Sequence, residues 1–273
     1  MSICLCLGSE VFMRHIDTHI HIERGEYTLD WIDEFVAQAV NREMDEIWLL
    51  EHCYRFREFV PMYESVCAYS DYIDEWLRQK AGTLGISDYL KLIEKVRDKK
   101  YPVDIKWGLE VCYFKKFEDF VHAQTKDLGL YFLLGSTHFV DDFAFDHKYE
   151  HWDGVDIDNV FKRYYEISID LANSGLFDGI AHPDSIKLYG HRPSFSLAPY
   201  YDEMAAALAK NNMYAEMNSG RYRRSGCEIG MNVDMIKAMK KHGVKIITAS
   251  DAHCPEDVGD NIIAMEEILR SNF

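Results

Sequence analysis

Short apolar segments alternate with amphipathic segments along most of the chain. The short apolar segments predict strands, and the amphipathic segments, which carry apolar residues at i, i+3 and i+4, predict helices. The predicted strands are 14–21, 46–51, 104–110, 131–137, 179–182, 213–218 and 244–249. The predicted helices are 29–42, 86–97, 155–173, 198–210, 233–242 and 260–269, with Asn232 as the N-cap of the fifth.

Strands that alternate with helices favour a parallel sheet with helical connections. Seven such units in 273 residues predict an α/β fold, a single closed or nearly closed TIM-like barrel. A doubly wound open sheet is the alternative, but it usually has a glycine-rich phosphate turn after its first strand. Here the first strand ends in His19-Ile20-His21 instead.

No linker rich in glycine or proline divides the chain, which predicts one domain over 13–273. The longest connection, around 53–100, is aromatic and charged and has helical patterns of its own, so it predicts a structured insertion or lid over one face of the barrel. Residues 1–12 are interpreted as an N-terminal extension, with Met13 as an alternative start. They lack the basic segment and long apolar segment of a signal peptide.

Composition narrows the functional classes. A hydrophobic fraction of 48% with 14% aromatic residues excludes disorder, and no apolar run approaches the 18 residues of a transmembrane helix. The formal net charge of −16 argues against a surface that binds nucleic acid or anionic membranes. Seven scattered cysteines without a CxxC pair predict neither a thiolate zinc site nor a disulfide framework, and favour the cytoplasm. Twelve histidines in an acidic chain still require an explanation.

The predicted strands end in residues that bind metals. In a barrel of parallel strands, all carboxyl ends open on one face, where active sites lie. Six histidines and two carboxylates therefore meet at one mouth: His19, His21, His52, Glu110, His138, His182, Asp251 and His253.

The spacing of two of these groups suits a shared ion. Residues two apart on a strand point the same way, with Cα atoms roughly 6.5–7 Å apart, so His19 and His21 can bind one metal. Asp251 and His253 have the same spacing. Imidazole with carboxylate suits Zn, Mn or Fe better than Ca or Mg. His15, His122, His147, His151 and His242 are interpreted as packing or surface residues. Each histidine of the cluster, taken alone, could have the same role; only their occurrence together at the strand ends indicates a metal site.

Several motifs together resemble those of the polymerase-and-histidinol-phosphatase (PHP) superfamily. They are Asp17-Thr-His19-Ile-His21, Glu51-His52, Gly108-Leu-Glu110, Gly135-Ser-Thr-His138-Phe139, Ala181-His182-Pro-Asp184 and Ser250-Asp251-Ala-His253. The segments 108–114, 138–142 and 251–259 resemble the histidinol-phosphatase branch in particular. The resemblance covers nearly the whole chain from Met13 and implies a distorted (β/α)7 barrel with a three-metal cluster.

The resemblance also implies a ligand set. His19, His21, Glu110 and Asp251 would hold the first metal, and Glu110 would bridge to a second metal on His138 and His182. His52 and His253 would hold the third, with one more ligand after His21. The superfamily commonly has Asp or His at the position of Tyr27, so Glu26 is the nearest substitute here. Two to three divalent ions are therefore expected.

The expected chemistry is hydrolysis of a small anionic phosphomonoester. A hydroxide held between two metals would be the nucleophile, and no protein nucleophile or general acid is assigned. Arginine matches phosphate geometry, and Arg221 and Arg223 follow the sixth strand, where the resemblance also places an arginine at Arg223. Lys187 and Arg192 form a second candidate clamp. For a cationic amino-alcohol part, Asp141, Asp142 and the tyrosines of the insertion remain open.

The favoured interpretation is L-histidinol-phosphate phosphatase of histidine biosynthesis, with another phosphorylated metabolite as an alternative substrate. A dinuclear amidohydrolase ranks lower because Glu110 stands where such enzymes use a modified lysine. A non-catalytic PHP module is disfavoured because at least eight ligands are kept. No nucleic-acid or membrane partner is expected, and the oligomeric state is left open.

Overall fold

The computed structural model describes residues 14–271, so the extension 1–12 and the start at Met13 lie outside the described residues. The strands are β1 (Ile16–His21), β2 (Glu46–Leu50), β3 (Asp104–Cys112), β4 (Phe132–Ser136), β5 (Gly179–Ile180), β6 (Tyr214–Asn218) and β7 (Ile246–Ala249). The helices are α1 (Leu29–Asn41), α2 (Glu64–Tyr69), α3 (Asp71–Lys80), α4 (Ile86–Arg97), α5 (Glu118–Thr125), α6 (Ile157–Asn173), α7 (Ala198–Lys210), α8 (Gly220–Ser225), α9 (Val233–Lys241) and α10 (Ile262–Ser271). None of the helices within 14–271 has both the length and the apolar character needed to cross a bilayer.

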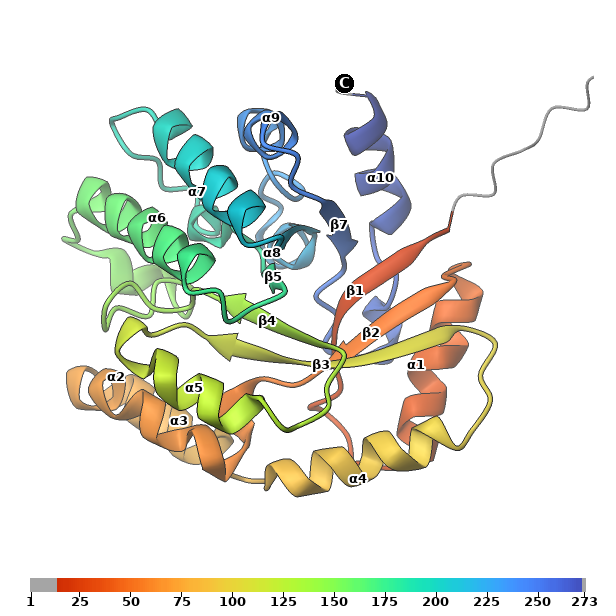
Figure 1. Ribbon diagram of the computed structural model, residues 1–273. Helices are drawn as coiled ribbons and strands as arrows, with labels where there is room; N and C mark the ends of the chain where they lie inside the picture. Colours follow the sequence, from red (N-terminus) through yellow and green to blue (C-terminus); the bar gives the residue numbers. More distant parts are fainter. Residues whose placement is uncertain (1–13, 272–273) are drawn as a thin grey trace, which may run out of the picture.

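The seven strands form one parallel sheet in the order β1 to β7, and helices surround it (Figure 1). β7 returns to β1: Ile20 and Ala252 form a parallel bridge, and the His21 amide donates to the Ala252 carbonyl at 2.8 Å. The sheet is therefore a nearly closed (β/α)7 barrel, as predicted. Its shortest strand, β5, has only two residues.

Two apolar cores hold the barrel together. The larger core lies between the outer face of the strands and the helices, and it includes Ile20, Leu49 and Val111. The smaller core fills the barrel interior with Trp48, Leu50, Phe132, Leu134, Ala181, Tyr214 and Ile247. The two faces follow from the alternation of side chains along each strand.

A bulge in β1 decides where its histidines point. Ile16 packs against the interior core. His19 and His21 follow it by an odd number of residues, and yet they too face the inside. Strict alternation would send them outward. The pairing with β2 shifts between Asp17 and Ile20, so β1 has one extra residue there, and this reverses the alternation.

Asp17 lies in this bulge and joins the two edges of the barrel. Its fully buried carboxylate accepts the amide of Ser250 through Oδ1 and that of Gly259 through Oδ2, both at 2.8 Å. Thr18 donates to the carbonyl of Thr248 at 3.0 Å. The bulge is thus fixed by the segment that follows β7 and by β7 itself.

The sequence-based boundaries agree with the structure to within two residues for the seven predicted strands and the six predicted helices. Asn232 caps α9 by accepting the amide of Met235, as predicted. The region 53–100 contains two 3-10 helices, Cys53–Arg55 and Arg57–Tyr63, then α2, α3 and α4. Because α4 is the ordinary connection from β2 to β3, the added part ends at α3; we call residues 53–80 the insertion. Two short helices, α5 between β3 and β4 and α8 between β6 and α9, were not predicted.

Replacing Asp17 tests the closure of the barrel. Asp17→Ala leaves two buried amides without an acceptor, so we expect the free energy of unfolding to fall by roughly 2–5 kcal/mol. Asp178→Ala is the matched control, because Asp178 also accepts a strand amide, that of Leu133, but is exposed. Denaturant unfolding of both variants measures the difference, and equal losses would contradict the role of Asp17.

Candidate metal centre

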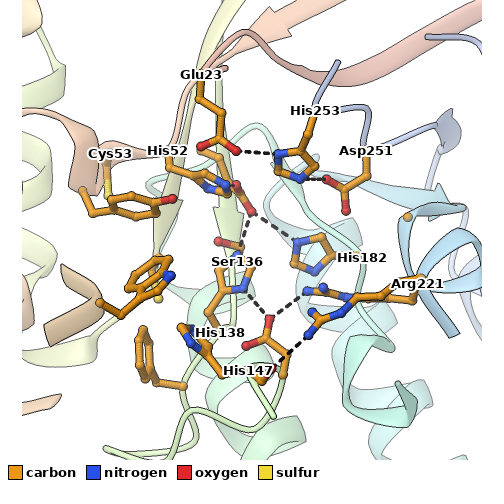
Figure 2. Close-up of a pocket in the computed structure, with 18 of the residues that line it drawn as sticks. Glu23, His52, Cys53, Ser136, His138, His147, His182, Arg221, Asp251 and His253 are labelled. Atoms are coloured by element: carbon orange, nitrogen blue, oxygen red, sulfur yellow. Dashed lines mark hydrogen bonds and ion pairs between the residues drawn. The ribbon is translucent and has the colours of Figure 1, made fainter. Parts of the chain in front are cut away.

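A cavity of about 490 Å³ opens at the carboxyl ends of the strands (Figure 2). Its floor is made of imidazoles and carboxylates, and arginines and aromatic side chains form its walls. The residues of the candidate cluster that line it are His52, Glu110, His138, His182, Asp251 and His253. His19 and His21 lie just beneath them and are fully buried.

The first group of ligand atoms is formed by His19, His21, Asp251 and Glu110. The Nε2 atoms of His19 and His21 are 2.9 Å apart. Oδ1 of Asp251 lies 3.6 and 3.7 Å from these two nitrogens, and Oε2 of Glu110 lies 3.8 and 3.5 Å from them. The structure therefore brings together all four residues expected at the first metal.

Glu110 also faces the other histidines. Its Oε1 lies 3.1 Å from Nε2 of His138 and 3.2 Å from Nε2 of His182. Its Oε2 lies 2.7 Å from Nδ1 of His52. One fully buried carboxylate thus lies between several imidazoles, as a bridging ligand would.

The residues expected at the third metal form a stack of rings with a carboxylate at its edge. The His21 ring lies 3.9 Å from the His52 ring and 4.4 Å from the His253 ring. Nδ1 of His253 is 2.8 Å from Oε1 of Glu23, and its Nε2 is 3.4 Å from Oδ1 of Asp251. His52 and His253 are thus together as expected, and the carboxylate beside them is Glu23.

Two carboxylates behind the cluster orient its histidines. Glu216 is fully buried; it contacts Nδ1 of His19 at 3.0 Å and accepts the backbone amide of His182 at 3.1 Å. Asp146 contacts Nδ1 of His138 at 2.9 Å. In each ring the bonded Nδ1 leaves Nε2 facing the other candidate ligands, which is the arrangement typical of histidines that bind metals.

Backbone strain accompanies two of the ligands. His182 and Asp251 have φ values of 28° and 56°, in the left-handed region that residues other than glycine rarely adopt. Gly220 makes room for Asp251, since a Cβ at that position would lie 2.5 Å from Oδ2 of Asp251. Such strain is concentrated at functional sites, and here it directs two ligands into the cavity.

Burial and mutual charge set the protonation of the cluster. Burial alone would lower the pKa of His19, but Glu216 and Asp251 outweigh it and raise that pKa to about 10. The pKa values of His138 and His253 rise to about 9, against burial, because of their carboxylate neighbours. Burial and the neighbouring histidines lower the pKa of His21 well below its usual value. The histidines whose pKa values are raised are thus protonated, and their positive charge compensates the negative charge of the buried carboxylates.

The donor set fits a cluster of divalent ions. Within residues 14–271, the buried Nδ1 atoms of His21 and His182 have no hydrogen-bond partner. Three overlapping groups have mutually close ligand atoms: His19 with His21 and Glu110, His21 with His52 and His253, and His52 with Glu110 and His138. Cations held there would compensate the carboxylates in place of protons.

Helix α8 places three guanidinium groups on the wall of the cavity. Arg221 donates to Oδ2 of Asp146 at 2.9 Å. Arg223 donates to the carbonyls of Ser250 and Asp251 at 2.9 and 2.7 Å, and so lies against the segment after β7. Arg224, which the sequence interpretation did not select, donates to the carbonyl of His147 at 3.0 Å and also lines the cavity.

Glu26 is not at the cavity, so its selection as a third-metal ligand was wrong. The chain turns directly after β1, at residues 23–25, which directs Glu23 inward and leaves Glu26 exposed. Tyr27, at the position that departs from the superfamily pattern, donates to Oε1 of Glu51 at 2.8 Å. Burial alone would raise the pKa of Glu23, but His253 and His52 outweigh it and lower that pKa to about 2. This carboxylate is therefore charged.

The second candidate clamp is also wrong. Lys187 is buried away from the cavity; its Nζ lies 2.6 Å from Oδ2 of Asp184 and donates to the carbonyl of Gly230. Arg192 is exposed and donates to the carbonyl of His191. Asp141 pairs with Arg163, and neither Asp141 nor Asp142 lines the cavity.

Sequence reasoning missed Glu23, Asp146 and Glu216. Glu216 had a signal. It lies two residues before Asn218, the residue with which the sixth strand ends, and residues two apart on a strand share one face. Glu23 and Asp146 lie in turns and loops, where side-chain direction has no period that the sequence reveals.

Comparison with known proteins agrees with this geometry. The PHP domain model matches residues 17–220. A protein of Deinococcus radiodurans named probable histidinol-phosphatase is 28% identical over 181 residues, which cover 64% of this chain and 67% of that protein. The crystal structure of histidinol phosphate phosphatase (HisK) from Lactococcus lactis, complexed with zinc, L-histidinol and phosphate, has a TM-score of 0.70 at 18% identity, covering 95% of this chain and 94% of that chain. This likeness shows the shared barrel fold.

The two glutamates after β1 form a matched test. Glu23→Gln removes a charge beside His253 and should weaken zinc binding by about 10- to 100-fold, as changes around metal ligands typically do. Glu26→Gln should leave zinc affinity unchanged, because that side chain is exposed. Competition with a chromophoric chelator measures both, and a larger effect of Glu26→Gln would contradict the assignment.

Metal binding should release protons. His19, His138 and His253, with pKa values of about 10, 9 and 9, are protonated at neutral pH in the metal-free chain. Each ring must lose a proton to bind a metal, so apparent zinc affinity should rise with pH up to about 10. Calorimetric titration in buffers of different ionisation enthalpy counts the protons, and uptake or no release would contradict these protonation states.

Proposed function

Since the chain belongs to the PHP domain family, we propose that it is a metal-dependent phosphomonoesterase that hydrolyses L-histidinol phosphate to L-histidinol and phosphate. The observation that carries the proposal is the pairing, in one cavity, of a histidine–carboxylate cluster with the three arginines of helix α8. The cavity is within the size range of sites for small molecules.

The cluster would hold two to three divalent ions, and zinc, manganese and iron all suit its donors. His19, His21, Glu110 and Asp251 would hold one ion, and His138 and His182 would share Glu110 with it. His52, His253 and Glu23 would hold the third. Bound there, such ions supply Lewis-acid chemistry, neutralising phosphate charge and making water more acidic.

The arginines of α8 would bind the phosphate. Arg221 is held by Asp146, which also contacts His138, so one carboxylate positions a guanidinium and a candidate ligand together. Arg223 has its guanidinium fixed by two carbonyls and lies 3.2 Å from Asp257. Groups fixed before the substrate arrives stabilise developing charge without reorganising during the reaction.

Two relatives support the choice of substrate. The Deinococcus radiodurans protein has the name of this activity, and the Lactococcus lactis enzyme was crystallised with the two products, L-histidinol and phosphate. A role in histidine biosynthesis in the cytoplasm follows from the same proposal. Another small phosphomonoester is the alternative, and it would use the same cluster and arginines.

The direct test is release of phosphate from L-histidinol phosphate by the metal-loaded protein. We expect turnover that depends on Zn, Mn or Fe, and Arg221→Ala should raise KM by about 10- to 100-fold, because charge-assisted hydrogen bonds to phosphate are lost. Steady-state kinetics with a phosphate-release assay measures both quantities.

Arg192→Ala is the control for the arginine variant, because Arg192 is exposed and outside the cavity, and its kinetics should match the wild type. Turnover of other phosphomonoesters without turnover of L-histidinol phosphate would contradict the substrate. An unchanged KM in Arg221→Ala would contradict the phosphate site.

A further inference from the structure

One wall of the cavity is aromatic and is not used by the chemistry described above. Tyr54, Tyr72 and Trp76 come from the insertion, and His147 comes from the loop after β4. Figure 2 shows Arg221 on one side of the cavity and Cys53, with which the insertion begins, on the other. The cavity thus has a cationic part and an aromatic part.

Helix α3 has two apolar stripes, and only one of them is fully buried in the core. Ile73 and Leu77 are 1% and 3% exposed and pack into the core. Tyr72 and Trp76 have the same i, i+4 spacing one position earlier, so they share a neighbouring face. Both are only partly buried and line the cavity. Both rings also pack against the core, and Nζ of Lys148 lies 3.9 Å from the centre of the Tyr72 ring, so the surface that this second stripe offers a ligand is mainly that of Trp76.

The aromatic wall continues to the metal centre. The Trp76 ring lies 4.8 Å from the His147 ring at an interplanar angle of 78°, and 5.1 Å from the Tyr54 ring at 61°. The Tyr54 ring in turn stacks on His52 at 4.9 Å and 19°. A molecule bound at the cluster would therefore meet this wall with the part that extends away from its phosphate.

Packing alone does not account for these rings. Tyr63 and Phe139 also line the cavity, yet they are 3% and 5% exposed and belong to the core. Tyr54, Tyr72 and Trp76 also pack against that core, but they are only partly buried and line a cavity that also holds charged groups. Partly exposed aromatic groups around a few polar ones are typical of sites for small ligands.

We propose that Trp76, with Tyr54 and Tyr72, binds the alcohol part of the phosphomonoester and selects substrates in which that part carries a flat ring. This inference rests on the proposed function, because it assumes that the cluster and the arginines of α8 bind the phosphate of the substrate. Flat rings pack against aromatic side chains in edge-to-face or offset stacks, which gives them an advantage over aliphatic chains of similar size. The insertion is thus the part of the chain that determines specificity.

The test compares substrates with and without a ring. The ratio of kcat/KM for L-histidinol phosphate to that for phosphoethanolamine should fall by about tenfold or more in Trp76→Ala, and by less in Trp76→Phe, which keeps a ring. Tyr131→Ala is the control, because Tyr131 is 60% exposed and outside the cavity. It should leave the ratio unchanged, and the zinc content should be equal in all variants.

A loss that is equal for both substrates, or no loss for either, would overturn the subsite. A second pair, benzyl phosphate and propyl phosphate, separates this inference from the proposed function. If L-histidinol phosphate is not turned over but the preference for benzyl phosphate depends on Trp76, the subsite is supported and the substrate assignment fails.

Binding provides a readout that does not need turnover. L-Histidinol should bind the zinc-loaded wild type at least tenfold more tightly than the Trp76→Ala variant, while 2-amino-1-propanol, which has no ring, should show a smaller difference. Calorimetry measures both ligands. Equal affinity of L-histidinol for the two proteins would overturn the subsite even if the phosphatase activity were absent.

Discussion

The burial of Glu110 is the constraint on which the rest of the site depends. A lone carboxylate in a protein interior is strongly disfavoured unless opposite charge or hydrogen bonds compensate it. Here His52, His138 and His182 lie within 3.2 Å of its oxygens and hold its pKa well below the usual value, against burial. The strand ends must therefore supply imidazoles at fixed positions around it, and the same positions suit metal ions.

Several features of the barrel meet this requirement. The bulge at Asp17 and Ile20 turns His19 and His21 inward, and Glu216 orients the first of them from behind. Strained backbone at His182 and Asp251 brings two more ligands to the same point. A chain of net charge −16 can nevertheless attract a phosphate, because the mouth combines arginines with sites for cations, and the local field there decides binding.

The sequence identified the strand-end histidines because the period of strands and the shared direction of parallel strands are general rules. It failed where no such rule applies. Glu23 and Glu26 both follow β1, and only the turn at residues 23–25 decides which of them reaches the cavity. Lys187 follows β5 in a short 3-10 helix, Ser185–Lys187, whereas Arg192 and Asp146 lie in loops, so their positions depend on tertiary contacts. The helix that holds Arg221 is too short for periodicity to reveal.

The central claim is that the strand-end cluster binds divalent ions that a phosphomonoesterase requires. Elemental analysis of protein purified without chelators, read alongside phosphatase activity, tests it most directly. We expect about two to three divalent ions per chain, with Asp251→Ala losing both metal and activity. Full activity in a preparation with almost no bound metal would contradict the account.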